Sequence, residues 1–266
     1  MSAQLPKDER SPIVAQVKLR VGADLDVDSF PGNLAFIKEL SLDIDSPVTF
    51  FVGENGSGKS TLLEAMAVVA GLPICGGGTN DFSAQFRTEE RSALAESLIL
   101  AFTRQPRDRY FFRAESQFHF ATLLEQRSED PDFLDAGGNR ADPFKAYGGT
   151  SLHQMSHGEA FLSVMQHRFQ SGLLLMDEPE SALSPQRQLA LLALMHEIVA
   201  GGASQFFIAT HSPILLTFPE AAIISFDHGS LRPVDIEETS HFRITRDLLN
   251  NPQAYWRHLA AVDQSG

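Results

Sequence analysis

The sequence predicts an α/β protein in which helices flank a mainly parallel central sheet. A short, continuously apolar run at 47–52 has the length and composition of a strand that is buried on both faces. Further strands are expected at 173–178 and 204–210. Segments with helical spacing and strong helix formers occupy 59–72 and 184–200. Strands that alternate with helices in this way imply a parallel α/β sheet.

The N-terminal part of the chain predicts a smaller, antiparallel β portion. Residues 13–21 alternate in polarity and are rich in valine, and 34–44 contain a second apolar stretch, so we expect a strand in each. The polar residues 1–12 are expected to form a disordered tail.

The middle of the chain predicts further strands and an inserted segment. Residues 91–102 and 109–115 should each run into a strand, and 116–126 suit a helix. The segment 127–151 is rich in Gly, Asp and Pro, which indicates a long loop. A helix is expected to resume at 157–170.

The C-terminal part predicts one more helix, at 245–260, packed on the domain with Trp256 in the core or an interface. We expect a single domain over 13–266, with an inserted helical and loop lobe at about 72–152.

Composition limits the function classes. The chain has 266 residues, 43% of them hydrophobic, which suits one large domain. A net charge of −13 disfavours binding of nucleic acid or anionic membrane over the whole surface. The single cysteine, Cys75, excludes an intrachain disulfide, and no stretch has the pattern of a secretory signal or a membrane span. We therefore expect a cytoplasmic protein with no integral membrane segment.

The segment "GENGSGKS", from Gly53 to Ser60, matches the phosphate-loop pattern G-x-x-x-x-G-K-[ST]. Glycines let the backbone curl so that successive N–H groups face phosphate oxygens, and the following helix adds its positive end. Lys59 should reach the β- and γ-phosphates, and Ser60 should hold Mg²⁺. The expected nucleotide-binding residues in this loop are Gly53, Glu54, Asn55, Gly56, Ser57, Gly58, Lys59, Ser60 and Thr61.

An acidic pair ends the apolar run at 173–178. Asp177 is placed to hold Mg²⁺ directly or through water, and Glu178 to polarise the water that attacks the γ-phosphate. An acidic pair that caps a strand can also be merely solvated. The phosphate loop upstream in the same chain favours the catalytic interpretation.

Two further segments follow the same order along the chain. In "MSHGE", Ser156 and Gly158 open a predicted helix and could form an anion site, although Ser156 could equally be a simple N-cap. In "ATHSP", His211 follows a strand and could contact the γ-phosphate, or it could be an ordinary loop histidine.

Taken together, these motifs resemble the ATP-binding-cassette (ABC) class of P-loop ATPases. The matching segments are Walker A "GENGSGKS", signature "MSHGE", Walker B "LLLMDE", D-loop "PESALS" and H-loop "ATHSP". More narrowly, 147–162 and 208–216 resemble the stand-alone AAA-family predicted ATPases near the RecF/SMC-like and OLD-like branch. Transporter cassettes usually have L-S-G-G-Q at the signature, and His157 and Glu159 depart from it, which disfavours a transporter.

The resemblance implies a P-loop NTPase fold with an insert before the signature motif, ATP as substrate and Mg²⁺ as cofactor. It also implies an ATP-dependent homodimer in which two subunits sandwich two ATP molecules head to tail. Ser156 and Gly158 would then act on ATP held by the other subunit, and 182–184 would lie at the dimer seam. Glu178 would be the base, Lys59 a catalytic phosphate contact and His211 the γ-phosphate sensor.

Two features of the class are ambiguous in this sequence. The Q-loop residue could be Glu115 or Gln117, with Gln85 a weaker candidate, and the adenine-stacking residue could be Phe30 or Phe36.

Three functions compete at this stage. The first is an Mg²⁺-dependent ATPase whose dimerisation switches an unknown protein client. The second is the ATP-binding subunit of an ABC transporter. The third is a DNA-maintenance or defence ATPase, suggested by the basic cluster Arg104, Arg107, Arg109 and Arg113. For this cluster, a solvated face or the neutralisation of nearby acids and phosphates is the favoured alternative.

Overall fold

The computed structural model describes the chain over residues 12–74, 76–78, 92–114, 117–134, 139–169 and 171–262. The expected tail, apart from Pro12, lies outside the described residues. So do Cys75, Gln85 and Glu115.

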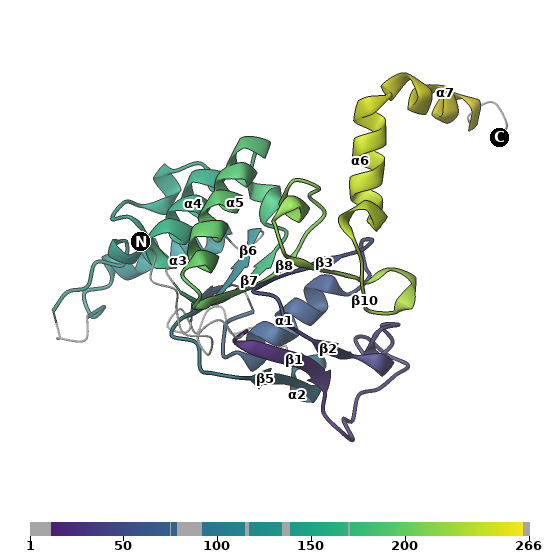
Figure 1. Ribbon diagram of the computed structural model, residues 1–266. Helices are drawn as coiled ribbons and strands as arrows, with labels where there is room; N and C mark the ends of the chain where they lie inside the picture. The colour runs from purple at the N-terminus through teal and green to yellow at the C-terminus, as the bar shows by residue number, and fades with distance from the viewer. Residues whose placement is uncertain are drawn as a thin grey trace.

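Among the described residues, the larger of two sheets has seven strands in the order β10-β9-β3-β8-β7-β6-β4 (Figure 1). The five inner strands pair in parallel, and only the short edge strands β10 and β4 are antiparallel. This confirms the parallel sheet expected from the apolar runs, since every residue of β3, β7 and β8 is buried. The bounds are β3 Val48–Val52, β4 Gly77–Gly78, β6 Arg109–Arg113, β7 Gly172–Asp177, β8 Ser204–Ala209, β9 Ala222–Ser225 and β10 Arg232–Pro233.

The smaller sheet is antiparallel, with the order β2-β1-β5. Its strands are β1 Val14–Leu19, β2 Ser41–Asp43 and β5 Leu98–Phe102, and the short helix α2, Ala93–Ser97, precedes β5.

The prediction of a strand over 34–44 is wrong for most of that segment. Only Ser41–Asp43 is extended, and Ile37–Glu39 forms a 3₁₀ turn. The reason is visible in burial. Phe36, Ile37 and Leu40 are all buried, which is the spacing of a helical turn and not the alternation of a strand.

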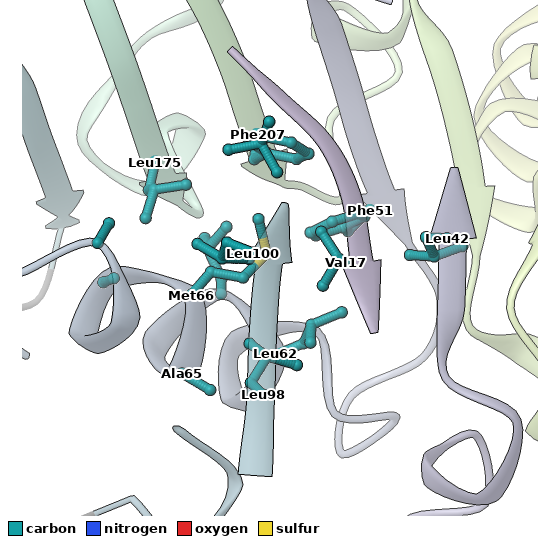
Figure 2. Packing of buried hydrophobic residues seen from close by; sticks show 14 of the residues in the cluster. Val17, Leu42, Phe51, Leu62, Ala65, Met66, Leu98, Leu100, Leu175 and Phe207 are labelled. Carbon is teal, nitrogen blue, oxygen red and sulfur yellow. The ribbon is translucent and has the colours of Figure 1, made fainter. Parts of the chain in front are cut away.

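Helix α1, Lys59–Val69, lies between the two sheets. Figure 2 shows Leu62 and Met66 of α1 packed among Phe51 and Phe207 of the large sheet and Val17 of the small one. All five side chains are buried. Apolar packing on both sides therefore fixes where β3 ends and α1 begins, which is where the phosphate loop lies.

Three helices cover the other face of the large sheet: α3 Gln117–Glu129, α4 His157–Arg168 and α5 Pro185–Ala200 (Figure 1). The segment expected to be a loop from 127 begins later than predicted, because α3 continues to Glu129. A 3₁₀ turn, Lys145–Tyr147, then interrupts it. The buried Tyr147 packs edge-on against Phe120 of α3, with 5.3 Å between ring centroids, so this end of the segment is anchored.

The C-terminal helix departs furthest from expectation. Two helices replace it, α6 Ser240–Asn250 and α7 Pro252–Val262, since Pro252 cannot continue α6. Figure 1 shows both projecting away from the sheets, and no residue of α6 is buried. Trp256 is 68% exposed, so its expected place in the core is wrong.

Candidate active site

The phosphate loop joins β3 to α1. The loop contains three glycines with positive φ: Gly53 at 146°, Gly56 at 78° and Gly58 at 97°. Residues other than glycine rarely adopt this backbone conformation. A Cβ on Gly58 would lie 2.6 Å from the ring of Phe36, so this glycine is also required for close packing.

Lys59 is buried in this loop. Its ammonium donates to the carbonyls of Gly53 and Glu54, at 2.7 and 2.9 Å. Burial lowers the pKa of Lys59, while the carboxylates of Glu178 and Asp227 raise it in opposition. Asp227, which belongs to none of the sequence motifs, follows β9 and accepts a hydrogen bond from the backbone N–H of Glu54 at 3.1 Å.

The two expected metal ligands meet. The Ser60 hydroxyl donates to Asp177 Oδ1 at 2.9 Å, although β8 lies between the strands that lead to them. Burial raises the pKa of Asp177 to about 6, and the hydrogen bond from Ser60 and the charge of Arg113 oppose that rise. Arg113 lies at the end of β6, with Nε 3.7 Å from Asp177 Oδ2, and it also pairs with Glu64 at 2.8 Å. A hydroxyl and a carboxylate at one point are a donor set that suits Mg²⁺.

Asp177 gives a first prediction, for the metal-free protein. Its raised pKa means that the folded state binds more protons than the unfolded state between about pH 4 and pH 6, so its ionisation lowers the free energy of unfolding as pH rises through this window. Asp177→Asn removes that titration. We expect the variant to gain stability relative to wild type as pH rises, measured by urea denaturation in chelator. The exposed Asp45→Asn is the control, and a difference that stays flat with pH would contradict the prediction.

Glu178 follows Asp177 directly and adopts a left-handed backbone, with φ of 47°. Strain of this kind persists where the surroundings hold it, and it often marks functional positions. Its Oε1 lies 3.5 Å from His211 Nε2. The His211 backbone N–H donates to Glu180 Oε1 at 2.6 Å, which ties the H-loop to the segment after β7.

The Nε2 atom of His211 is buried and makes no hydrogen bond to any described residue. The Ser57 hydroxyl oxygen, in the phosphate loop, is likewise buried and makes no hydrogen bond to any described residue. Buried polar atoms without partners are costly, so two of them around Lys59 fit a site that a phosphate group completes.

The signature segment begins α4. Ser156 is its N-cap and closes a capping box with Glu159, so the simple capping interpretation is confirmed as its local role. The exposed Ser156 hydroxyl donates to Glu159 Oε2 at 2.7 Å and accepts from Arg187 of α5 at 2.8 Å. A Cβ on Gly158 would lie 2.7 Å from Arg187, so this glycine makes room for the arginine. Arg187 belongs to none of the sequence motifs.

Comparison with known proteins decides the family. Residues 79–217, more than half of the chain, match the family model described as "AAA domain, putative AbiEii toxin, Type IV TA system". The chain belongs to this AAA-domain family. It is a P-loop ATPase of the ABC/AAA class, and members of the class hydrolyse ATP.

Relatives of this AAA-domain ATPase include importer subunits. The ribose import ATP-binding protein RbsA of Jannaschia sp. (strain CCS1) is 27% identical over 68% of this chain but only 36% of its own length. The cobalt import ATP-binding protein CbiO of Salmonella paratyphi A is 27% identical over 73% of each chain. Among solved structures, the SMC head domain from Thermotoga maritima aligns with a TM-score of 0.43 and 14% identity, over 84% of this chain and 99% of that one.

The two ambiguous features of the ATPase are partly decided. Phe36 is wrong as the adenine-stacking residue, because it is 1% exposed and packs beneath Gly58. Phe30 is 68% exposed and remains the candidate. For the Q-loop, Glu115 and the side chain of Gln117 lie outside the described part, so no choice between them follows.

Three of the four arginines in the basic cluster of the ATPase make contacts within the chain, while Arg107 is exposed. Arg104 donates to the carbonyl of Gly202, Arg109 to that of Ala70, and Arg113 serves Glu64 and Asp177 as described. These contacts favour neutralisation and anchoring over a nucleic-acid surface. Within the described residues, no helix combines the length and apolar character needed to cross a membrane.

Proposed function

We propose that this ATPase hydrolyses Mg-ATP between two copies of the chain arranged head to tail, and that the cycle switches an unknown protein client. The observation that carries the hydrolytic part is the convergence of Ser60, Asp177, Glu178 and His211 beside Lys59. Lys59 and Ser60 begin α1, Asp177 ends β7 and Glu178 follows it, and His211 follows β8. They supply a cation, a metal-binding pair, a carboxylate base and an imidazole nitrogen, His211 Nε2, that makes no hydrogen bond within the described residues.

Each residue has a defined task in the proposal. The backbone of 53–58 and Lys59 bind the phosphates, while Ser60 and Asp177 would hold Mg²⁺, which neutralises charge on the phosphate oxygens when bound. Glu178 accepts the proton of the attacking water, and its side chain, which is 45% exposed, has the access to do so. His211 Nε2 donates to the γ-phosphate. Support for this comes from its lack of a hydrogen bond within the described chain.

The dimer part of the proposal rests on the signature segment. Ser156 is exposed, and its hydrogen bonds go to Glu159 and Arg187. In the part of the chain that is described, none of the hydrogen bonds of Ser156 reaches residues 53–61. This is consistent with our proposal that Ser156 contacts the γ-phosphate of an ATP molecule held by the phosphate loop of a second copy.

A transporter subunit is the second candidate, because RbsA and CbiO are import ATP-binding proteins by name. The departure of the signature from L-S-G-G-Q disfavours it. In this chain Glu159 is bound to Ser156 and pairs with Arg187 at 3.0 Å, so the glutamate has a local structural role. The family description mentions a toxin–antitoxin system, but the contacts of the arginine cluster give no support to a nucleic-acid client.

The test is ATP turnover per subunit against protein concentration, with sizing by light scattering in Mg-ATP. We expect turnover per subunit to rise with concentration and Glu178→Gln to accumulate as an ATP-bound dimer. Ser156→Arg should keep the monomer folded but block closure. If turnover per subunit is flat and Glu178→Gln remains monomeric, the homodimer is excluded. Turnover that then appears only with an added membrane partner would favour the transporter subunit.

A further inference from the structure

We propose that His241, in the first turn of α6, is a positioning residue that holds His211 in the tautomer whose Nε2–H faces the γ-phosphate. The proposal deepens the function proposed above and rests on the role given there to His211. Neither the ABC-type motifs nor the matched residues 79–217 include His241.

The two imidazole rings are in direct contact. His241 Nε2 lies 2.8 Å from His211 Nδ1, and the ring centroids are 4.6 Å apart at an interplanar angle of 66°. The other ring nitrogen of His211 faces Glu178 Oε1 at 3.5 Å. His211 is thus held at its backbone by Glu180 and at its ring by His241, while Nε2 points to the reacting region.

The chemistry of these partners fixes the direction of the hydrogen bond. A neutral imidazole has one N–H donor and one acceptor nitrogen. Ionised Glu178 and phosphate oxygens only accept, so Nε2 of His211 must be the donor. Nδ1 is then the acceptor, and His241 must donate to it from Nε2. Burial lowers the pKa of His211, and electrostatic interaction with Lys59 and His241 lowers it further, while Glu178 and Glu54 act in the opposite direction. The lowered pKa favours the neutral imidazole that this hydrogen-bond direction requires.

The position of His241 in the fold supports a role beyond packing. α6 has no buried residue, yet its first turn reaches the nucleotide site. Thr239, Ser240 and Arg243 line a pocket of about 710 Å³ whose opposite wall is the phosphate-loop tip, 54–57. The helix that projects from the body in Figure 1 therefore starts beside the proposed catalytic groups.

The kinetic test compares three variants in steady-state ATP hydrolysis. His241→Ala removes the donor, and we expect kcat to fall about tenfold with KM for ATP within about twofold, because ground-state phosphate contacts remain. His241→Gln can place an amide N–H near the lost Nε2 and should retain at least half of the wild-type kcat. His196→Gln, at an exposed position on α5, is the matched control and should be unchanged.

The spectroscopic test does not depend on activity. The ¹⁵N chemical shifts of the imidazole nitrogens of His211, assigned by difference from His211→Gln, report which nitrogen carries the proton. We expect a proton on Nε2 in wild type and in His241→Gln, and a mixture of tautomers in His241→Ala. A proton on Nδ1 in the wild-type protein would overturn the proposal.

The combined results separate the possible failures. If His241→Gln loses as much kcat as His241→Ala while the His211 tautomer is unchanged in both, His241 acts only through packing and the proposal is wrong. Full activity of His241→Ala overturns it as well. If wild type fails to hydrolyse ATP, the proposed function has failed, and the tautomer measurement still decides whether His241 sets the state of His211.

Discussion

Glu178→Gln is expected to lower ATP turnover by about 10²- to 10⁴-fold, the usual contribution of a positioned general base. Glutamine has nearly the same shape but cannot take a proton from water. Glutamine also has a Cβ, so the strain of the left-handed backbone at this position is unchanged. The loss of turnover therefore reports the loss of the general base alone. ATP affinity should stay within about threefold, because Glu178 repels rather than binds phosphate charge.

The measurement is single-turnover hydrolysis beside equilibrium binding of ATP. Glu197→Gln, at an exposed position of α5, removes one carboxylate far from the phosphate loop in the sequence and controls for net charge. Turnover above about a tenth of wild type in Glu178→Gln would assign the base to another residue.

Lys59→Met is expected to weaken ATP binding by about 100-fold or more. The buried ammonium makes charge-assisted hydrogen bonds, which are worth about 1.5–3 kcal/mol each, and methionine fills the space without replacing them. The folded state should not suffer in parallel, because burial disfavours the charge of Lys59, as the lowered pKa shows.

Calorimetric titration with Mg-ATP tests the Lys59 prediction, and chemical denaturation checks that the variant is folded. The exposed Lys38→Met serves as control for the loss of a positive charge. An affinity within about fivefold of wild type would show that the ammonium does not contact phosphate in the bound state.

Periodicity predicted the part of the fold in which burial is complete. The runs that became β3, β7 and β8 are mostly apolar, although Ser204 and Gln205 begin β8, and their length suits a strand rather than a helix. Prediction failed where burial is partial. At 36–40 a helical turn packs against the core, and in α6 the apolar residues face solvent. The sequence pattern does not show whether an apolar face has a partner within the chain.

The candidate site divides in a similar way. Lys59, Ser60 and Asp177 belong to short sequence motifs that each imply a particular local backbone conformation, so these residues could be predicted from the sequence. The partners of Arg113, Asp227 and His241 in the site are Asp177, Glu54 and His211, which lie 64, 173 and 30 positions away in the sequence. No local sequence pattern around these three residues indicates such distant partners. A polar residue just beyond the carboxyl end of a parallel strand is the one general indication. It applies to Asp227, which lies two residues after β9, the strand beside β3.

The contact between Gly58 and Phe36 has a consequence for nucleotide exchange. Phe36 meets the edge of Phe226 at 5.0 Å, and Phe226 meets Phe51 at 5.3 Å, so an aromatic column supports the phosphate-binding backbone from below. A cradle that is already shaped loses little conformational entropy when it is filled. We expect association to be fast and similar for different nucleoside triphosphates, so that residence time on the protein, rather than the rate of capture, distinguishes one nucleotide from another.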